Sequence, residues 1–118
     1  IMLRRCDGPA DLTDILSDPR HNAVALGPAL GVGQATRDFV AAALGSEAAI
    51  VLDADALTSF EGRALDLAAL ATGRAPPVVT PHEGEFARLF AGLAEQVADP
   101  SKLERTRKAA ALLGAVVV

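Results

Sequence analysis

The sequence predicts an α/β fold in which a mainly parallel sheet is the middle of three layers. Short, continuous apolar runs such as Ala23–Leu26 (AVAL) and residues 48–52 (AAIVL) alternate with longer stretches of helical periodicity. Strands of a parallel sheet that is covered on both faces show such continuous runs, because neither side of the strand meets water. Gly, Pro or Asp stands beside these runs, where strands should give way to turns.

The expected strands, in chain order, lie at residues 1–3, Ala23–Leu26, 48–52, Val78–Val79 and 115–118. The first would be an edge strand, and the other four would be core strands. Gly27 and Pro28 close the first core strand, and Asp53 closes the second. The sequence contains no internal repeat, low-complexity segment or linker, so we expect one domain over residues 1–118.

Helical periodicity fills the segments between the strands. Phe86, Leu89, Phe90 and Leu93 recur at i, i+3, i+4 and i+7, which predicts an amphipathic helix. Another stripe begins at Leu103 and is followed by Gly114. Glycine is common just after the end of a helix. The expected helices lie at residues 11–16, Gln34–Leu44, 63–71, 86–93 and 103–113, with a capping loop at residues 99–101.

Composition and charge exclude several classes of function. Fifteen acidic residues face 11 basic ones, the formal net charge is −4, and the basic residues are scattered, whereas nucleic-acid binding needs a basic face. Trp and Tyr are absent, so bases would find few aromatic platforms. A single Cys6 allows no internal disulfide and no cysteine-only metal site. No membrane-length apolar run or secretory leader pattern occurs, so we expect a cytoplasmic protein without nucleic-acid or membrane partners.

The first unusual turn follows Ala23–Leu26 and reads GPALGVGQATR. Its glycines permit positive φ and close backbone approach, and a helix starting near Gly33 would offer N–H groups to a phosphate. The known nucleotide fingerprints are not met, because no Lys follows the glycines and the third glycine of GxGxxG is missing. Tight packing between strand and helix explains the glycines equally well.

The second unusual turn is DADAL, which begins at Asp53. Two acids one residue apart at a strand end could hold Mg²⁺ through water or accept hydrogen bonds from a ribose. Alternatively, Asp55 is the N-cap of a short helix. Asp53 is harder to explain structurally, since a carboxylate at the end of a buried strand needs a partner.

The third unusual turn is TPHEGEFAR, beginning at Thr80. Thr80 and Glu83 have capping-box spacing, with Pro81 at N1 and His82 at N2. Gly84 in the first helical turn costs about 1 kcal/mol relative to Ala, so we expect something to approach the backbone there. A neutral His82 could donate to a phosphate or a carbonyl, because the helix dipole disfavours the protonated imidazole.

These three turns are expected at one edge of the sheet, since each follows a core strand. Ligands of parallel α/β sheets bind outside the carboxyl ends of the strands. The combination therefore predicts a ligand site more strongly than any one turn does.

The motifs GPALG, VLDADAL and VVTPHEGEFARLF, in this order, resemble those of the ADP- or ATP-dependent NAD(P)H-hydrate dehydratases. This family belongs to the ribokinase-like superfamily, and the resemblance covers most of residues 2–118. It implies a lyase that repairs hydrated NADH or NADPH. The ring hydroxyl would be phosphorylated from ADP or ATP, with Mg²⁺, and phosphate would then be eliminated.

The resemblance also implies where the hydrated dinucleotide binds. Together with Asp53, the implied substrate-binding residues are Gly27, Gly31, His82, Glu83, Gly84, Glu85, Phe86, Ala87 and Arg88. The family's catalytic and nucleotide-binding residues lie in a Lys-Gly segment and a GTGD-type turn beyond the last strand, which residues 1–118 do not contain. The resemblance thus implies a partial, carbohydrate-kinase-like domain, incomplete at its C-terminal side and inactive alone.

One departure from the family pattern is Ala29, which replaces a glycine of GPGLG. If this position needs positive φ, the alanine is strained by roughly 1–2 kcal/mol. Two other functions remain open: another ribokinase-like small-molecule kinase, or a non-catalytic nucleotide-binding remnant. The resemblance is compatible with an epimerase domain fused upstream and with a homo-oligomer.

Overall fold

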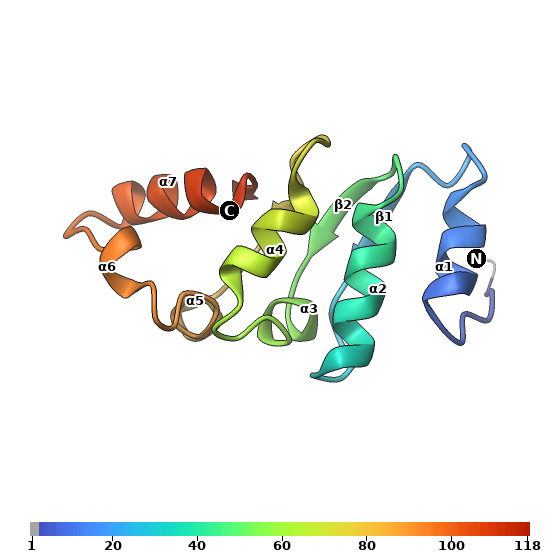
Figure 1. Cartoon of the computed structure of the whole chain (residues 1–118), viewed down its shortest axis with the longest axis horizontal. Coiled ribbons are helices and arrows are strands. Elements are labelled where there is room, and N and C mark those ends of the chain that lie inside the picture. The colour runs from blue at the N-terminus through green and yellow to red at the C-terminus, as the bar shows by residue number, and fades with distance from the viewer. Residues whose placement is uncertain (1–2) are drawn as a thin grey trace.

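The computed structural model describes residues 3–118 and shows alternating helices and strands (Figure 1). The element bounds, in chain order, are α1 Pro9–Leu16, β1 Ala23–Leu26, α2 Gln34–Leu44, β2 Ala49–Leu52, α3 Asp55–Thr58, α4 Ala64–Ala71, β3 Val78–Val79, α5 Glu83–Leu89, α6 Ala94–Val97, α7 Lys102–Leu113 and β4 Val116–Val117. None of the helices within these described residues has the length and apolar character that a membrane crossing requires.

The four strands form one parallel sheet in the order β1-β2-β3-β4. This confirms the predicted α/β class and the four core strands. The register aligns Leu26 with Leu52 and Leu52 with Val79, and Val79 in turn with Val117. The carboxyl ends of neighbouring strands therefore lie at the same edge.

The described residues supply two of the three expected layers, the sheet and one layer of helices. Each strand follows its neighbour in the chain, and right-handed crossovers between adjacent parallel strands place their helices on the same face. Leu52 and Val79 on that face are 0% exposed, whereas Val51 and Val116 on the other face are 37% and 50% exposed. The continuous apolar strands thus have one covered face and one open face within residues 3–118.

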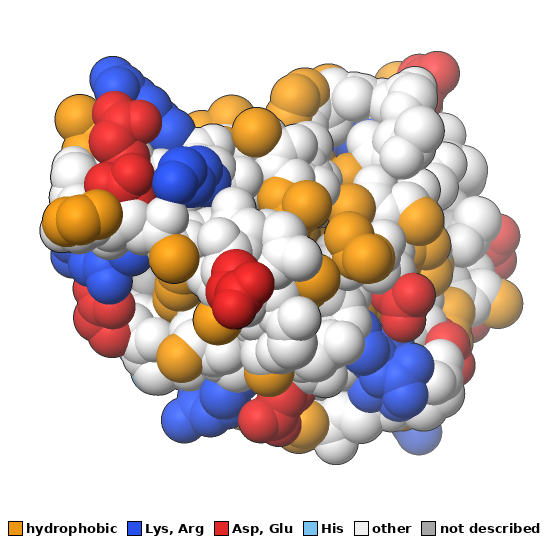
Figure 2. Space-filling model, turned by 60° about the vertical axis from the view of Figure 1, so that its left-hand side comes forward, with side chains coloured by type: hydrophobic (Ala, Val, Ile, Leu, Met, Phe, Trp, Pro, Cys, Tyr) orange, Lys and Arg blue, Asp and Glu red, His pale blue; other side chains and the backbone are white. Residues whose placement is uncertain are grey.

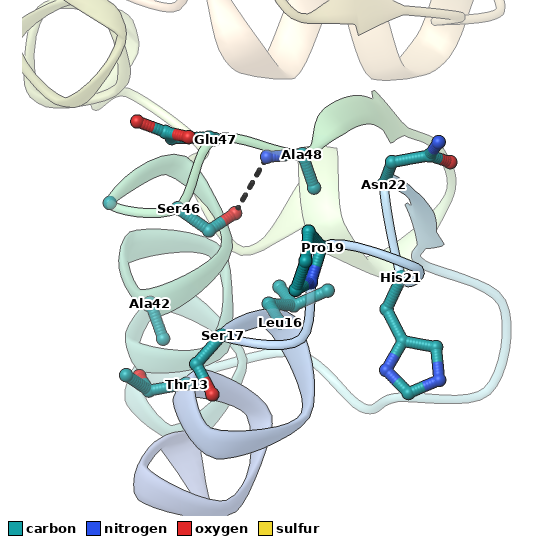
Figure 3. A pocket seen from close by; sticks show the side chains of 11 residues that line it. Thr13, Leu16, Ser17, Pro19, His21, Asn22, Ala42, Ser46, Glu47 and Ala48 are labelled. Carbon is teal, nitrogen blue, oxygen red and sulfur yellow. Dashed lines mark hydrogen bonds between the residues drawn. The ribbon is translucent and has the colours of Figure 1, made fainter.

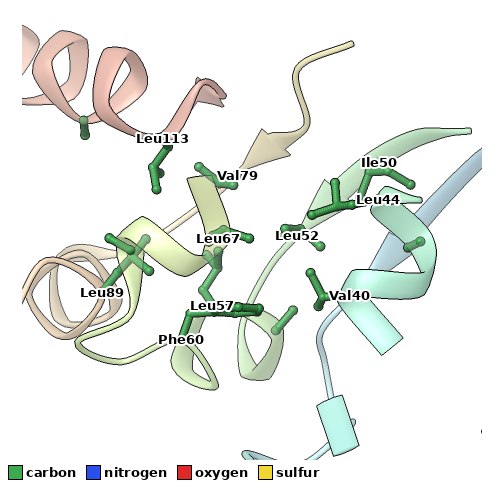
Figure 4. Close-up of a cluster of buried hydrophobic side chains, with 14 of the residues drawn as sticks. Val40, Leu44, Ile50, Leu52, Leu57, Phe60, Leu67, Val79, Leu89 and Leu113 are labelled. Atoms are coloured by element: carbon green, nitrogen blue, oxygen red, sulfur yellow. The ribbon is translucent and has the colours of Figure 1, made fainter. Parts of the chain in front are cut away.

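The hydrophobic core lies between the sheet and the helices (Figure 4). Ile50, Leu52 and Val79 provide its sheet side. Helices α2, α4 and α7 provide the opposite side through buried residues such as Val40, Leu67, Leu113. One continuous cluster links these elements, so the turns at the strand ends are mounted on a single packed unit.

Some predicted boundaries were wrong. Of the expected edge strand at residues 1–3, residues 1–2 lie outside the described residues, and Leu3 is 97% exposed and not in a strand. The Phe86–Leu93 stripe does not form one helix, because α5 ends at Leu89 and Gly92 takes a φ of 83°. The capping role of Ser101 and the left-handed Gly114 after α7 are both confirmed.

Arg74 connects the loop before β3 to the C-terminal end of α2. Its guanidinium donates to the carbonyl oxygens of Leu44, Ser46 and Ala48 at 2.8, 2.9 and 2.6 Å. The last carbonyls of a helix lack partners within the helix, and a cation there also faces the negative end of its dipole. Arg74 therefore fixes the connection from α2 into β2.

We predict that Arg74→Ala lowers the free energy of unfolding by roughly 2–3 kcal/mol, because several charge-assisted hydrogen bonds are lost together. Arg74→Lys should lose less stability than Arg74→Ala because lysine keeps the positive charge. It should still be less stable than the wild type, since an ammonium group reaches fewer carbonyls. Urea denaturation of the parent protein measures both. The matched control is Arg63→Ala, which removes only an exposed pair with Asp66 and should change stability by less than about 0.5 kcal/mol. An equal effect of the two alanine variants would contradict this role.

Candidate functional site

The three unusual turns follow β1, β2 and β3 at the carboxyl edge of the sheet. The backbone N–H of Asp53 donates to Leu26 O at 3.0 Å, and that of Thr80 donates to Leu52 O at 3.2 Å. The ladder thus continues one residue beyond each strand. It carries Asp53 beside the end of β1 and Thr80 beside the end of β2, as the sequence predicted.

Gly27 is the point of closest approach between the first two turns. It has a φ of 152°, and a Cβ atom placed on it would lie 1.7 Å from the carbonyl oxygen of Asp53. No side chain fits in this contact. Gly27 is therefore required for packing, but between two turns and not between strand and helix as the structural explanation had it.

Helix α3 holds the rest of the glycine turn. The Gly31 N–H donates to Asp55 Oδ2 at 2.8 Å, and the Gly33 N–H donates to Ser59 Oγ at 3.2 Å. Arg37 reinforces the contact by donating to the carbonyl oxygen of Ser59 at 2.7 Å. These two N–H groups are engaged by the protein, whereas the first turn of α2 has no side-chain cap.

One interpretation of the sequence was that Asp55 is the N-cap of a short helix, and the structure shows that it is not. It is the first residue of α3, and Ala54 stands at the cap position without a side-chain hydrogen bond. The carboxylate instead reaches across to the neighbouring turn at Gly31. Ser59 and Arg37 complete this contact. Ser59 lies outside the motifs, and Arg37, although it ends the first turn, was missed because nothing in its spacing indicates a contact with α3.

Two alanines in these turns have positive φ. Ala29 has a φ of 63° and Ala54 a φ of 49°. A non-glycine residue in this region costs roughly 1–2 kcal/mol. Such strain persists only where the surroundings impose it, and it is concentrated at functional sites. The sequence predicted strain at Ala29 if this position has positive φ. The position does have positive φ, so the strain is present.

Asp53 differs from Asp55 in having a carboxylate that the protein does not engage. It is half-buried, and within residues 3–118 only its backbone makes hydrogen bonds, to Leu26 and Ala56. A carboxylate that is partly removed from water without a partner is ready to accept hydrogen bonds from a ligand. Asp53 is thus the acidic candidate at this edge.

His82 is the N-cap of α5. Its Nδ1 accepts from the N–H groups of Gly84 and Glu85 at 3.0 and 3.2 Å, and Glu85 Oε1 accepts from the His82 N–H at 3.1 Å. The predicted capping box of Thr80 and Glu83 was wrong. Thr80 is still bound to β2 through its N–H and hydroxyl, so the helix begins later than that spacing assumed.

The capping geometry defines the state of the imidazole. Because Nδ1 accepts hydrogen bonds, the proton of the neutral ring is on Nε2, which lies 3.4 Å from Glu85 Oε2. The His82 side chain is 66% exposed, and that of Glu85 is 8% exposed. His82 thus presents a neutral ring to solvent, while the predicted site residue Glu85 is a buried supporting group.

The imidazole also explains Gly84. A Cβ atom at Gly84 would lie 3.0 Å from Cε1 of His82, closer than most real contacts allow. The close approach predicted from this glycine is made by the capping side chain itself.

The other predicted residues of this segment lie on α5 and differ in exposure, Phe86 being half-buried against the core. Glu83 Oε1 pairs with Lys102 Nζ at 3.6 Å. Phe86 packs against Phe90 with ring centroids 4.8 Å apart. Ala87 and Arg88 are exposed. The turns at the carboxyl edge therefore carry Gly27, Asp53 and His82. Within α5, Glu85 supports the backbone, whereas Ala87 and Arg88 face solvent.

The described residues do not assemble a metal site. No group of three acidic, His or Cys side chains comes together among them, and the carboxylate of Asp55 is engaged by Gly31. Mg²⁺ prefers several oxygen ligands in octahedral geometry. Residues 3–118 therefore do not by themselves supply a full set of protein ligands for a magnesium ion.

A pocket also lies at the opposite, amino edge of the sheet, between α1 and α2 (Figure 3). It has a volume of about 600 Å³, and His21, Asn22 and Ser46 are among the residues that line it. His21 Nδ1 lies 2.8 Å from the carbonyl oxygen of Ile15, which ties the ring to α1. Ligands of parallel sheets bind at the carboxyl edge, so this pocket is not the candidate site.

The fold is that of an α/β protein with three unusual turns at the carboxyl ends of its parallel strands. A model of the NAD(P)H-hydrate dehydratase family matches residues 6–118. The chain belongs to this family.

Curated relatives are bifunctional NAD(P)H-hydrate repair enzymes. That of Synechocystis sp. is 38% identical over 99 residues, covering 84% of this chain and 18% of the relative. That of Gloeobacter violaceus is 44% identical over 89 residues, covering 74% and 16%. That of Leishmania infantum is 40% identical over 108 residues, covering 79% and 19%. The chain thus spans less than a fifth of the length of these relatives. No solved structure matches.

We predict that Ala29→Gly raises the free energy of unfolding by about 1 kcal/mol, because glycine adopts positive φ without the steric cost of Cβ. Thermal or urea denaturation measures the change. The same substitution at Ala69, an exposed residue inside α4, should have the opposite sign and cost about 1 kcal/mol. Destabilisation by both substitutions would show that Ala29 is not strained.

We predict that His82→Ala lowers stability by about 1 kcal/mol through loss of the cap, and that His82→Asn largely restores it because asparagine is a strong N-cap. Circular dichroism during urea denaturation measures both variants. If Asn were as destabilising as Ala, the capping role assigned to Nδ1 would be wrong.

Proposed function

We propose that this chain is the part of an NAD(P)H-hydrate dehydratase domain that binds the hydrated dinucleotide. The observation that carries the proposal is the match of the family model to residues 6–118, combined with the position of the family-like motifs at one sheet edge. The parent protein would repair hydrated NADH or NADPH. The other domain of the bifunctional relatives would belong to the parent as well.

The proposed reaction is the net loss of water from the hydrated nicotinamide ring. As the resemblance suggests, the ring hydroxyl would be phosphorylated by ADP or ATP, and phosphate would leave as the double bond re-forms. Catalysis of such phosphoryl transfer rests mainly on positioning and on stabilising charge. The phosphoryl donor and the lyase class are parts of the proposal.

The residues of this chain would contribute binding and orientation. Asp53 has an unengaged carboxylate at the end of β2 and would accept hydrogen bonds from hydroxyl groups of the dinucleotide. The exposed ring of His82 would border the bound substrate as a neutral group, since its Nδ1 is already used by the helix cap. Asp55 would act indirectly, by holding the Gly31 backbone in place.

The function is tested by incubating the full-length parent protein with hydrated NADH and either ATP or ADP, and following recovery of the absorbance of NADH. Turnover with one donor is expected. Absence of turnover with both donors, in a folded preparation, would contradict the proposed function.

We predict that Asp53→Asn in the parent lowers kcat/KM for the hydrated dinucleotide by roughly tenfold, the effect of weakening one charged hydrogen bond. The matched control is Asp66→Asn, which changes an exposed carboxylate on α4 paired only with Arg63 within the described residues and should leave kcat/KM unchanged. Equal values for Asp53→Asn and the wild type would remove Asp53 from the site.

A further inference from the structure

A second pocket lies next to His82, between α5, α7 and the end of β4. It has a volume of about 300 Å³, and its walls include Phe86, Lys102, Arg105 and Val117. His82 also lines it, so it adjoins the candidate site at the same carboxyl edge. Neither Lys102 nor Arg105 belongs to the motifs that the sequence singled out.

The charges around this pocket do not cancel. Lys102 Nζ is compensated by Glu83 Oε1 at 3.6 Å. Within residues 3–118, the guanidinium of Arg105 has no hydrogen bond or ion pair; only its backbone is bonded, with its N–H donating to Ser101 O. Arg105 therefore lines the pocket without an ion pair within the described chain, and a nearby acid, Asp99, is itself paired with Lys108.

The acids of the surrounding segment are engaged elsewhere. Glu104 Oε1 accepts from Arg107 Nη1 at 2.6 Å, and Asp99 Oδ2 lies 3.3 Å from Lys108 Nζ. The Ser101 N–H, assisted by Lys108 and more weakly by Arg105, lowers the pKa of Asp99. Figure 2 turns this end of the molecule forward and shows basic side chains dispersed among acidic and apolar ones. The surplus charge is local to Arg105.

The walls of the pocket favour an anion beside Arg105. Arg105 is half-buried, and Phe86 and Val117 supply apolar surface next to it. A guanidinium partly removed from water gains more from an anionic partner than an exposed one does. Its planar fork matches the oxygen geometry of a phosphate group.

We propose that this pocket is a phosphate subsite in which Arg105 binds a phosphate group of a nucleotide. The inference rests on the proposed function, because it assigns the pocket to a substrate of that reaction. The phosphate belongs either to the hydrated dinucleotide or to the phosphoryl donor, and both would present it as a phosphate ester or anhydride. Arg105 acts as a binding residue and takes no part in bond making or breaking.

The test compares Arg105→Gln with Arg107→Gln in the full-length parent, measuring kcat and KM for each substrate. Arg107 is on the same helix, but it is exposed and paired with Glu104, so its variant should match the wild type. Arg105→Gln should raise one KM about tenfold, the effect of one charged hydrogen bond to phosphate, with kcat changed by less than twofold. The substrate whose KM rises is the source of the phosphate.

Two results would overturn the proposal: both KM values within twofold of the wild type in a folded Arg105→Gln variant, or a fall in kcat alone. If Arg105→Gln fails to fold, Arg105→Lys replaces it; the lysine keeps the charge but loses the fork, and an unchanged KM for both substrates would reject the subsite.

Failure of the proposed function is distinguishable, because the wild type would then show no turnover. Calorimetric titration with inorganic pyrophosphate still tests the pocket in that case. Binding by the wild type and by Arg107→Gln, but not by Arg105→Gln, would support the subsite, and equal binding by all three would reject it.

Discussion

The close approach of Gly27 to the carbonyl oxygen of Asp53 is the constraint on which the candidate site depends. A Cβ atom at Gly27 would lie 1.7 Å from that oxygen, so the first two turns can pack only if this residue is glycine. The contact brings the glycine turn over α3, where Asp55 and Ser59 bind its N–H groups. The positive φ angles of Ala29 and Ala54 are maintained beside it. Packing at the strand ends thus organises the backbone that a ligand would meet.

As a result of this packing, the polar side chains at this edge fall into two groups, those that bind the backbone and those that remain available to a ligand. Asp55 and Glu85 use their carboxylates to hold backbone N–H groups, and these acids support the turns. Asp53 is half-buried without a side-chain partner among the described residues, and His82 presents most of its ring to solvent. The groups left available lie at the carboxyl edge of a parallel sheet, where such folds bind ligands. This distribution supports the proposed dinucleotide site.

Much of the fold could be predicted from sequence, because continuous apolar runs identify parallel strands and topology then places their ends together. The open face of the sheet within residues 3–118 could not be predicted, since continuous apolar runs indicate strands that are covered on both faces. The cap of α5 was assigned to Thr80 because Thr is a common N-cap. Its hydrogen bonds to Leu52 depend on strand pairing that local spacing does not report. The contact from Gly31 to Asp55 joins two motifs through tertiary packing, so neither motif predicts it alone.

The most direct test of the central claim is a crystal structure of the parent protein with the hydrated dinucleotide bound. The account predicts density for the dinucleotide at the carboxyl edge, with a hydroxyl group within hydrogen-bonding distance of the Asp53 carboxylate and part of the ligand against the His82 ring. Density instead at the amino edge, in the pocket between α1 and α2, would contradict it.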